Sequence, residues 1–135
     1  MIGIVVVTHG QLAVELLNAA EMIVGDLPRF TAVSIGWHQN TDDAREDIEQ
    51  AIAGVQQGDG VLIVTDMFGG TPANLAMTFL TQEHVEVVTG VNLPMLIKLA
   101  GLTAHASLLE SAREIREHGR HAIWVASDLL RGEKA

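Results

Sequence analysis

The residues best suited to chemistry are a histidine and an aspartate, each placed at the end of an apolar run. His9 follows Ile2–Thr8, and Asp66 follows Val61–Thr65. An imidazole in a turn before a helix can attack a phosphoryl group, because the free N–H groups of the helix stabilise its oxygens. A carboxylate bonded to one ring nitrogen leaves the other nitrogen free as the nucleophile. The pair therefore predicts phosphoryl transfer through His9, with Asp66 orienting the ring.

Both residues also have a purely structural interpretation. His9 also fits a partly buried turn histidine that bonds to the main chain. Asp66, taken alone, fits a carboxylate that caps a helix or a turn. Position in the sequence leaves both alternatives open.

A glycine-rich segment follows Asp66 and offers a second element of an anion site. Gly69-Gly70-Thr71 can form a concave run of main-chain N–H groups for phosphate oxygens, with the Thr71 hydroxyl as a further donor. Gly10 lets the chain bend directly after His9. The same residues also fit a tight turn with a helix cap and no function. The segment lacks the Gly-Lys-Ser/Thr of a phosphate-binding loop and the Gly-x-Gly-x-x-Gly of dinucleotide sites, so conventional nucleotide binding has little support.

Residue types exclude several other chemistries. The chain has no cysteine, which rules out disulfides, thiolate metal sites and a cysteine nucleophile. Its six histidines show no metal-binding pattern, so we expect no metal and no organic cofactor. The histidines other than His9 are interpreted as solvated or structural. Five residues near the strand ends are candidates for docking a protein partner: Met67, Phe68, Trp37, His38 and Asn92.

Strands and helices alternate along the chain. Strands are expected at Ile2–Thr8, Phe30–Ile35, Val61–Thr65, Val85–Thr89 and Ala122–Val125. Helical periodicity covers Ala13–Ile23 and Ala44–Val55. Thr71 is expected to cap a third helix, with Pro72 at its first position. Pro94–Ala100 and Ser107–His118 form two more helices, the last of them ended by Gly119. This order predicts an α/β fold with a doubly wound, mainly parallel sheet and helices on both faces. Ligands of such sheets bind beyond the carboxyl ends of the strands, where His9 and Asp66 lie.

Length and charge limit the classes of protein further. The 135 residues fit one domain, which we expect to span residues 1–130, with a polar tail over residues 131–135. Eight Lys and Arg residues against 17 Asp and Glu residues give a net charge of −9, which disfavours binding to nucleic acid or an anionic membrane. No signal sequence or membrane span is recognisable, so we expect a cytoplasmic protein.

These motifs resemble a known family. The chain is similar over nearly its whole length to the enzyme IIA component of the mannose/fructose-type (mannose family) sugar phosphotransferase system. The resemblance is carried by Ile4-Val5-Val6-Val7-Thr8-His9-Gly10, by Asp66-Met67-Phe68-Gly69-Gly70-Thr71-Pro72-Ala73-Asn74, and by Gly90-Val91-Asn92-Leu93-Pro94-Met95. Several spaced motifs in the correct order are more specific than any one of them.

The resemblance implies a function for the site residues. His9 would be phosphorylated on Nε2 by the histidine-containing phosphocarrier protein and would pass the phosphoryl group to a histidine of an enzyme IIB. Asp66 would orient His9, and Thr71 would lie near the phosphoryl group. The chain would be a homodimer whose sheet includes an antiparallel C-terminal strand exchanged between subunits, with Ala122–Val125 as the candidate. Contact with a membrane would be indirect, through the transporter components.

Other functions remain open at this point. The chain also fits a regulatory protein whose phosphorylation state controls a partner without onward transport of sugar. It also fits the phosphocarrier subunit of a dihydroxyacetone kinase, although the glycine-rich strings favour the mannose type. A passive module that binds a phosphate-bearing small molecule is a further class, and it predicts no covalent phosphohistidine.

Overall fold

The structure, a computed structural model, describes residues 1–135 except 38, 82–83, 103–105 and 133–135. Its strands are β1 (Gly3–His9), β2 (Phe30–Ile35), β3 (Val61–Thr65) and β4 (Val85–Thr89). Its helices are α1 (Leu12–Val24), α2 (Thr41–Val55), α3 (Thr71–Met77), the 3₁₀ helix η1 (Thr78–Thr81), α4 (Leu93–Ala100), α5 (Leu108–His121) and α6 (Ala126–Leu130).

The four strands form a parallel sheet in the order β2-β1-β3-β4. From β1 the chain moves first outward to β2 and then back across to β3, so the strand order switches between β1 and β3. Ligands of open α/β sheets bind at this switch, outside the carboxyl ends of the strands. The topology therefore directs attention to the residues that end β1 and follow β3.

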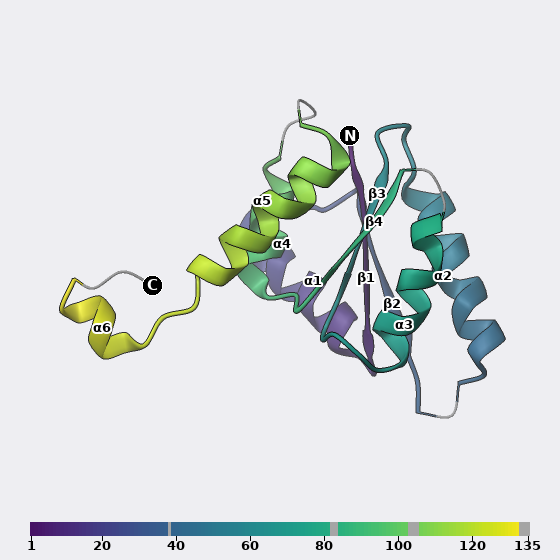
Figure 1. The fold of residues 1–135 in the computed structure, drawn as a ribbon, viewed down its shortest axis with the longest axis horizontal. Coiled ribbons are helices and arrows are strands. Elements are labelled where there is room, and N and C mark those ends of the chain that lie inside the picture. The colour runs from purple at the N-terminus through teal and green to yellow at the C-terminus, as the bar shows by residue number, and fades with distance from the viewer. Residues whose placement is uncertain (38, 82–83, 103–105, 133–135) are drawn as a thin grey trace.

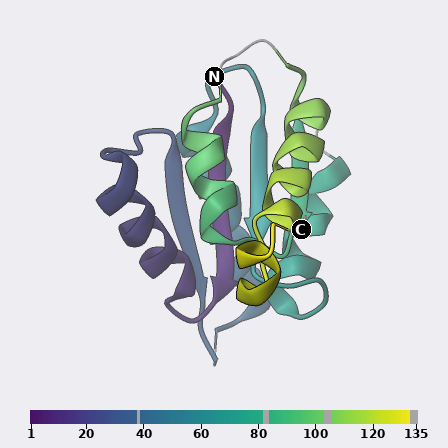
Figure 2. The same cartoon turned by 90° about the vertical axis from the view of Figure 1, so that its left-hand side faces the viewer.

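Helices cover both faces of the sheet, as the sequence predicted (Figure 1). One face packs against α1, α4 and α5, which lie side by side in Figure 2, and the other packs against α2 and α3. Side chains of β1 alternate between the two cores: Ile4 and Val6 join the first, and Val5 and Val7 join the second. Continuing this alternation places His9 on the α3 side of the sheet and Thr8 on the α1 side.

The C-terminal segment differs from the prediction. Ala122–Val125 was expected as an antiparallel strand, but the structure has a turn and irregular chain there, followed by the short helix α6. A strand needs a partner for its main-chain hydrogen bonds, and in Figure 1 this segment runs away from the sheet. The single chain therefore does not form the fifth strand, and its exchange between subunits stays a prediction.

Two predicted helix boundaries were also wrong. Gly119 was expected to end the last long helix at His118, but α5 continues to His121. A Cβ at Gly119 would lie 2.6 Å from Cγ and Sδ of Met95, so this glycine permits close packing of α4 on α5. The cap of α3 is Gly70 rather than Thr71, and Pro72 is then the second residue of that helix.

Within the described parts of the chain, we find no helix with the length and apolar character needed to cross a membrane.

Candidate active site

His9 and Asp66 meet at the switch between β1 and β3. Val7 lies opposite Thr65 in the parallel pairing, so strands β1 and β3 end side by side. Asp66 Oδ2 accepts hydrogen bonds from His9 Nδ1, at 2.8 Å, and from the His9 main-chain N–H, at 3.0 Å. Its other oxygen, Oδ1, accepts the main-chain N–H of Met67 at 3.0 Å. The carboxylate therefore holds both the ring and the backbone of the histidine.

Asp66 is ionised at neutral pH. Burial acts to raise the pKa of Asp66, but the hydrogen bonds from His9, the attraction of its ring and the Met67 N–H together outweigh burial and lower that pKa. An ionised carboxylate only accepts hydrogen bonds, so the proton between it and the imidazole belongs to Nδ1. In the neutral ring, Nε2 then carries the lone pair. The His9 side chain is 52% exposed, so the imidazole is accessible from solvent. The Asp66 side chain is only 13% exposed, so the carboxylate that orients the ring is largely shielded from water.

The lowered pKa of Asp66 predicts a pH-dependent stability. Because the unfolded chain protonates Asp66 at a higher pH than the folded one, its contribution is present above the ordinary pKa of 3.8 and lost as pH falls through the folded value. We expect Asp66→Asn to unfold about 1 kcal/mol more easily than wild type at pH 7, a difference that disappears at lower pH. Thermal melts from pH 7 to pH 3 measure it, with Asp26→Asn, an exposed loop carboxylate, as the control. A difference that stays constant with pH contradicts the assignment.

The glycine-rich turn approaches the other side of the imidazole. A Cβ built on Gly70 would lie 3.1 Å from Cε1 and 3.2 Å from Nε2 of His9, so any larger residue at this position would press on the ring. Gly69 and Gly70 also have φ angles of +82° and +83°, in the left-handed region. The turn places Gly70 as the cap of α3, with Thr71 as its exposed first residue.

Gly10 directly follows the histidine in the turn before α1. Its φ angle is +53°, and its N–H donates to the Ile35 carbonyl oxygen at 2.9 Å. Of the residues named from the sequence, Asp66 and Gly70 approach the His9 ring, Gly10 follows His9 in the chain, and Gly69 and Thr71 flank Gly70. No group of three or more metal-binding side chains exists among the residues that the structure describes.

The candidate docking residues are less uniform. Met67, Phe68 and Trp37 are exposed, by 54%, 73% and 93%. His38 lies outside the described residues. Asn92 has a structural contact on each side-chain atom: Oδ1 accepts the Met95 N–H at the start of α4, and Nδ2 donates to the Gly119 carbonyl oxygen. Asn92 thereby joins the loop after β4 to α5.

Sequence reasoning did not give Thr8 a role. Thr8 is fully buried, and its hydroxyl oxygen accepts the main-chain N–H of Ala13 at 2.7 Å, in the first turn of α1. The sequence held one indication of this role. Gln11, the residue directly before α1, is a poor helix cap, and Thr8 offers a hydroxyl oxygen three residues earlier.

Comparison with known proteins identifies the family. A family model described as the PTS system fructose IIA component matches residues 3–116. The chain belongs to this mannose family of PTS enzyme IIA components. Members of the family are phosphotransferases of sugar transport that work with a phosphocarrier protein and an EIIB component. The match spans β1 to most of α5 and includes every residue of the site.

Individual relatives agree with the family assignment. The chain is 28% identical over 131 residues to the PTS system fructose-specific EIIA component of Bacillus subtilis, covering 96% of this chain and 90% of that one. It is 36% identical over 98 residues to the mannose-specific EIIAB component of Escherichia coli, covering 72% of this chain but only 30% of that longer protein. A crystal structure of the PTS IIA protein associated with the fucose utilization operon from Streptococcus pneumoniae matches with a TM-score of 0.84 and 28% identity, over 96% of each chain.

Proposed function

We propose that this enzyme IIA carries a phosphoryl group covalently on Nε2 of His9. The donor is the phosphohistidine of the histidine-containing phosphocarrier protein, and the acceptor is a histidine of an enzyme IIB. The observation that carries the proposal is the Asp66–His9 hydrogen bond, at 2.8 Å, which favours the tautomer with its proton on Nδ1 and leaves Nε2 as the nucleophile. Family membership supports the two partners.

The chemistry requires little from the protein beyond positioning. The Nε2 lone pair attacks the phosphorus in line, and a new N–P bond forms while the donor N–P bond breaks. The donor nitrogen keeps that electron pair as the neutral imidazole reforms. Bonds of one kind are exchanged, so orientation and charge stabilisation account for the catalysis. Asp66 stabilises the ring when it gains positive character, and the reverse sequence of steps delivers the group to enzyme IIB.

The phosphoryl oxygens need donors around Nε2. We assign this role to the main chain of Gly10, Gly69 and Gly70 and to the hydroxyl of Thr71. Gly70 lies against the Nε2 edge of the ring, and Thr71 opens α3 beside it. Main-chain N–H groups in such turns bind anions without a metal ion or an organic cofactor.

The partners approach an exposed apolar rim. Met67 and Phe68 lie directly after the orienting carboxylate, and their exposure of 54% and 73% suits transient contact with two successive protein partners. Both partners and this chain act in the cytoplasm, and only the transporter components meet the membrane. Onward transfer distinguishes this carrier from a regulatory protein, in which phosphate on His9 itself would be the signal.

The proposal is tested by intact mass after incubation with phosphoenolpyruvate, enzyme I and the phosphocarrier protein, followed by addition of an enzyme IIB. One acid-labile phosphate that then moves to enzyme IIB supports the carrier. A phosphate that stays on the chain with every enzyme IIB tried favours the regulatory alternative. No phosphate, with the donor shown active on another acceptor, contradicts both.

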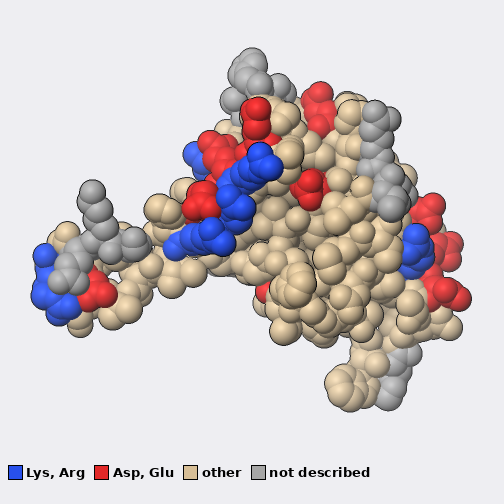
Figure 3. Space-filling model, in the orientation of Figure 1, with Lys and Arg blue, Asp and Glu red and all other residues tan. Residues whose placement is uncertain are grey.

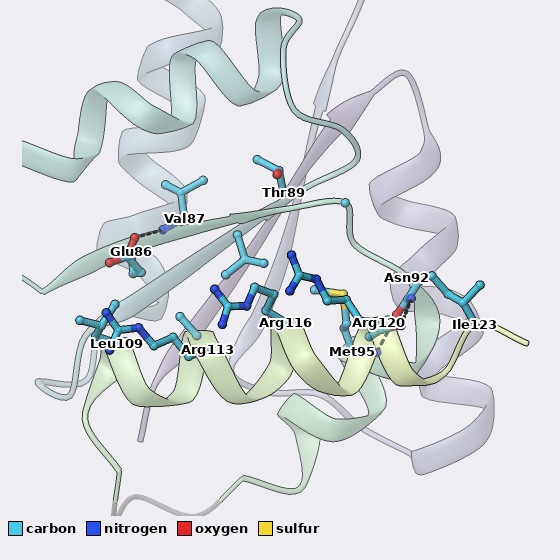
Figure 4. Close-up of a pocket in the computed structure, with 14 residues that line it drawn as sticks. Glu86, Val87, Thr89, Asn92, Met95, Leu109, Arg113, Arg116, Arg120 and Ile123 are labelled. Carbon is cyan, nitrogen blue, oxygen red and sulfur yellow. Dashed lines mark hydrogen bonds between the residues drawn. The ribbon is translucent and has the colours of Figure 1, made fainter. Parts of the chain in front are cut away.

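We also propose that the enzyme IIA is a homodimer. Strand β4 is an edge of the sheet, and a cavity of about 420 Å³ lies between it and α5. Arg113, Arg116 and Arg120 extend from α5 toward β4 in this cavity (Figure 4). In Figure 3, Lys and Arg side chains gather over α5, with Asp and Glu side chains beside them. An unpaired strand edge beside such a cavity invites strand addition.

The C-terminal segment of a second copy is the proposed occupant. Ile123 and Val125 are 70% and 66% exposed, and α6 has no buried residue, so this segment has an apolar surface that the single chain leaves uncovered. We expect sedimentation to give twice the 14.5 kDa of one chain. Val125→Asp is expected to give the monomer, whereas Met22→Asp, at a position 88% exposed on α1, keeps the dimer. A monomeric wild type contradicts the proposal.

A further inference from the structure

The residue before His9 is buried on the opposite face of the sheet. Side chains alternate along β1, so Thr8 points to the α1 side while His9 lies on the α3 side. Thr8 is 0% exposed, which is unusual for a hydroxyl residue at the end of a strand. A buried hydroxyl costs free energy unless it is hydrogen-bonded, so its partner shows what it contributes.

That partner is the first turn of α1. The Thr8 hydroxyl oxygen accepts the Ala13 main-chain N–H at 2.7 Å. The residue directly before the helix, Gln11, makes no side-chain cap bond, so Thr8 satisfies a helix N–H that the usual cap position leaves open. Thr8 therefore caps α1 from within the preceding strand.

The bond closes a small loop around the reactive histidine. Between Thr8 and Ala13 lie His9, the turn residue Gly10 with its positive φ, and the start of α1. Within this loop, the His9 N–H bonds to Asp66 and the Gly10 N–H bonds to the Ile35 carbonyl oxygen. The Thr8 side chain ties the start of this turn to α1, and the Gln11 carbonyl oxygen, which accepts the Glu15 N–H at 3.1 Å, ties its end.

We propose that Thr8 is a positioning residue for phosphoryl transfer. It acts through the main chain of the turn, keeping Nε2 of His9 beside Gly70 and Nδ1 on Asp66, and it does not touch the phosphoryl group. This inference rests on the proposed function. A misplacement of the nucleophile by about 1 Å is enough to slow transfer strongly.

The test compares three variants of Thr8 with a cap deletion elsewhere. Thr8→Val is nearly isosteric and removes the acceptor, Thr8→Ala removes it without adding a methyl group, and Thr8→Ser keeps it. Ser107→Ala is the matched control, because the Ser107 hydroxyl caps α5 by accepting the Glu110 N–H at 3.1 Å. Leu108, the next residue, lies near Gly60, which directly precedes β3. This is the end of the strands opposite to the one that carries His9.

Two readouts separate positioning from stability. We expect Thr8→Val and Thr8→Ala to lower the maximal rate of phosphate acceptance roughly tenfold with little change in the KM for the donor protein. Thr8→Ser is expected to stay within about twofold of wild type. Ser107→Ala is expected to lower the melting temperature without changing the rate. In ¹H–¹⁵N spectra of the unphosphorylated protein, the His9 Nδ1–H resonance is expected to broaden or shift in Thr8→Val and Thr8→Ala only.

Three outcomes would overturn the proposal: wild-type rates in Thr8→Val and Thr8→Ala, equal slowing in Ser107→Ala, or equal slowing in Thr8→Ser. If wild type itself accepts no phosphate, the proposed function fails, and the spectra still decide the role of Thr8. An unchanged Nδ1–H resonance in Thr8→Val and Thr8→Ala then shows that the hydroxyl does not position His9.

Discussion

Replacing His9 with alanine is expected to abolish phosphate acceptance and leave the fold intact. The ring is 52% exposed, and its Nδ1 makes a hydrogen bond to Asp66. Loss of that bond costs about 1 kcal/mol, small beside the stability of a domain of this size. Loss of Nε2 removes the only atom that the proposed mechanism uses to hold the phosphoryl group. Intact mass after incubation with the donor system measures the first effect, and circular dichroism measures the second.

Two comparison variants make this result specific. His118→Ala removes an exposed imidazole on α5 and is expected to accept phosphate as wild type does. Asp66→Ala keeps the acceptor atom but loses its orientation, and we expect slower acceptance that still reaches one phosphate per chain. A phosphorylated His9→Ala variant would show that another residue is the acceptor. An unfolded His9→Ala variant would favour a structural role for the histidine.

Replacing Gly70 with alanine is expected to have the second-largest effect. The new Cβ would lie 3.2 Å from Nε2 and 3.1 Å from Cε1 of His9, closer than ordinary van der Waals contact. The ring must then turn away from α3 or the loop must move, and either change misplaces the nucleophile. We expect a loss of roughly 100-fold in the rate of phosphate acceptance, measured with a saturating donor.

Gly69→Ala is the matched control for this substitution. Gly69 has nearly the same φ angle, +82° against +83°, but a Cβ there meets nothing within 4 Å. Both variants carry the strain of an alanine at a positive φ, so both are expected to melt at lower temperature. Only Gly70→Ala also crowds the imidazole. Equal loss of rate in the two variants would mean that backbone strain, rather than contact with His9, controls the site.

The parallel sheet was predictable because buried strands are visible in a single sequence. The apolar runs Phe30–Ile35, Val61–Thr65 and Val85–Thr89 coincide with β2, β3 and β4. The rule that ligands bind beyond the carboxyl ends of parallel strands then led to His9 and Asp66, which the structure joins by a hydrogen bond. The contact between Gly70 and the imidazole was not predictable, since it depends on the path of the loop and on the ring rotamer.

The errors have a common cause, which is that a sequence pattern does not name the partner of a residue. Glycine is typical of helix ends, but Gly119 lies inside α5, where the absence of a side chain lets Met95 of α4 pack closely against it. Ala122–Val125 has the composition of a strand, but within the single chain it does not pair with the sheet, so strand pairing there would require a second copy. The Asn92 side chain bonds to α4 and α5, contacts that the sequence pattern did not indicate, and its place on a docking surface stays a prediction.

The account is tested most directly by determining which nitrogen carries the phosphate. The wild-type chain, labelled with ¹⁵N in its histidines, is phosphorylated by phosphoenolpyruvate, enzyme I and the phosphocarrier protein, and its imidazole spectrum is recorded. The account predicts one phosphohistidine, at His9, with phosphorus on Nε2 and the proton retained on Nδ1 beside Asp66. Phosphate on Nδ1 of His9, on another residue, or on none while the donor is active would contradict it.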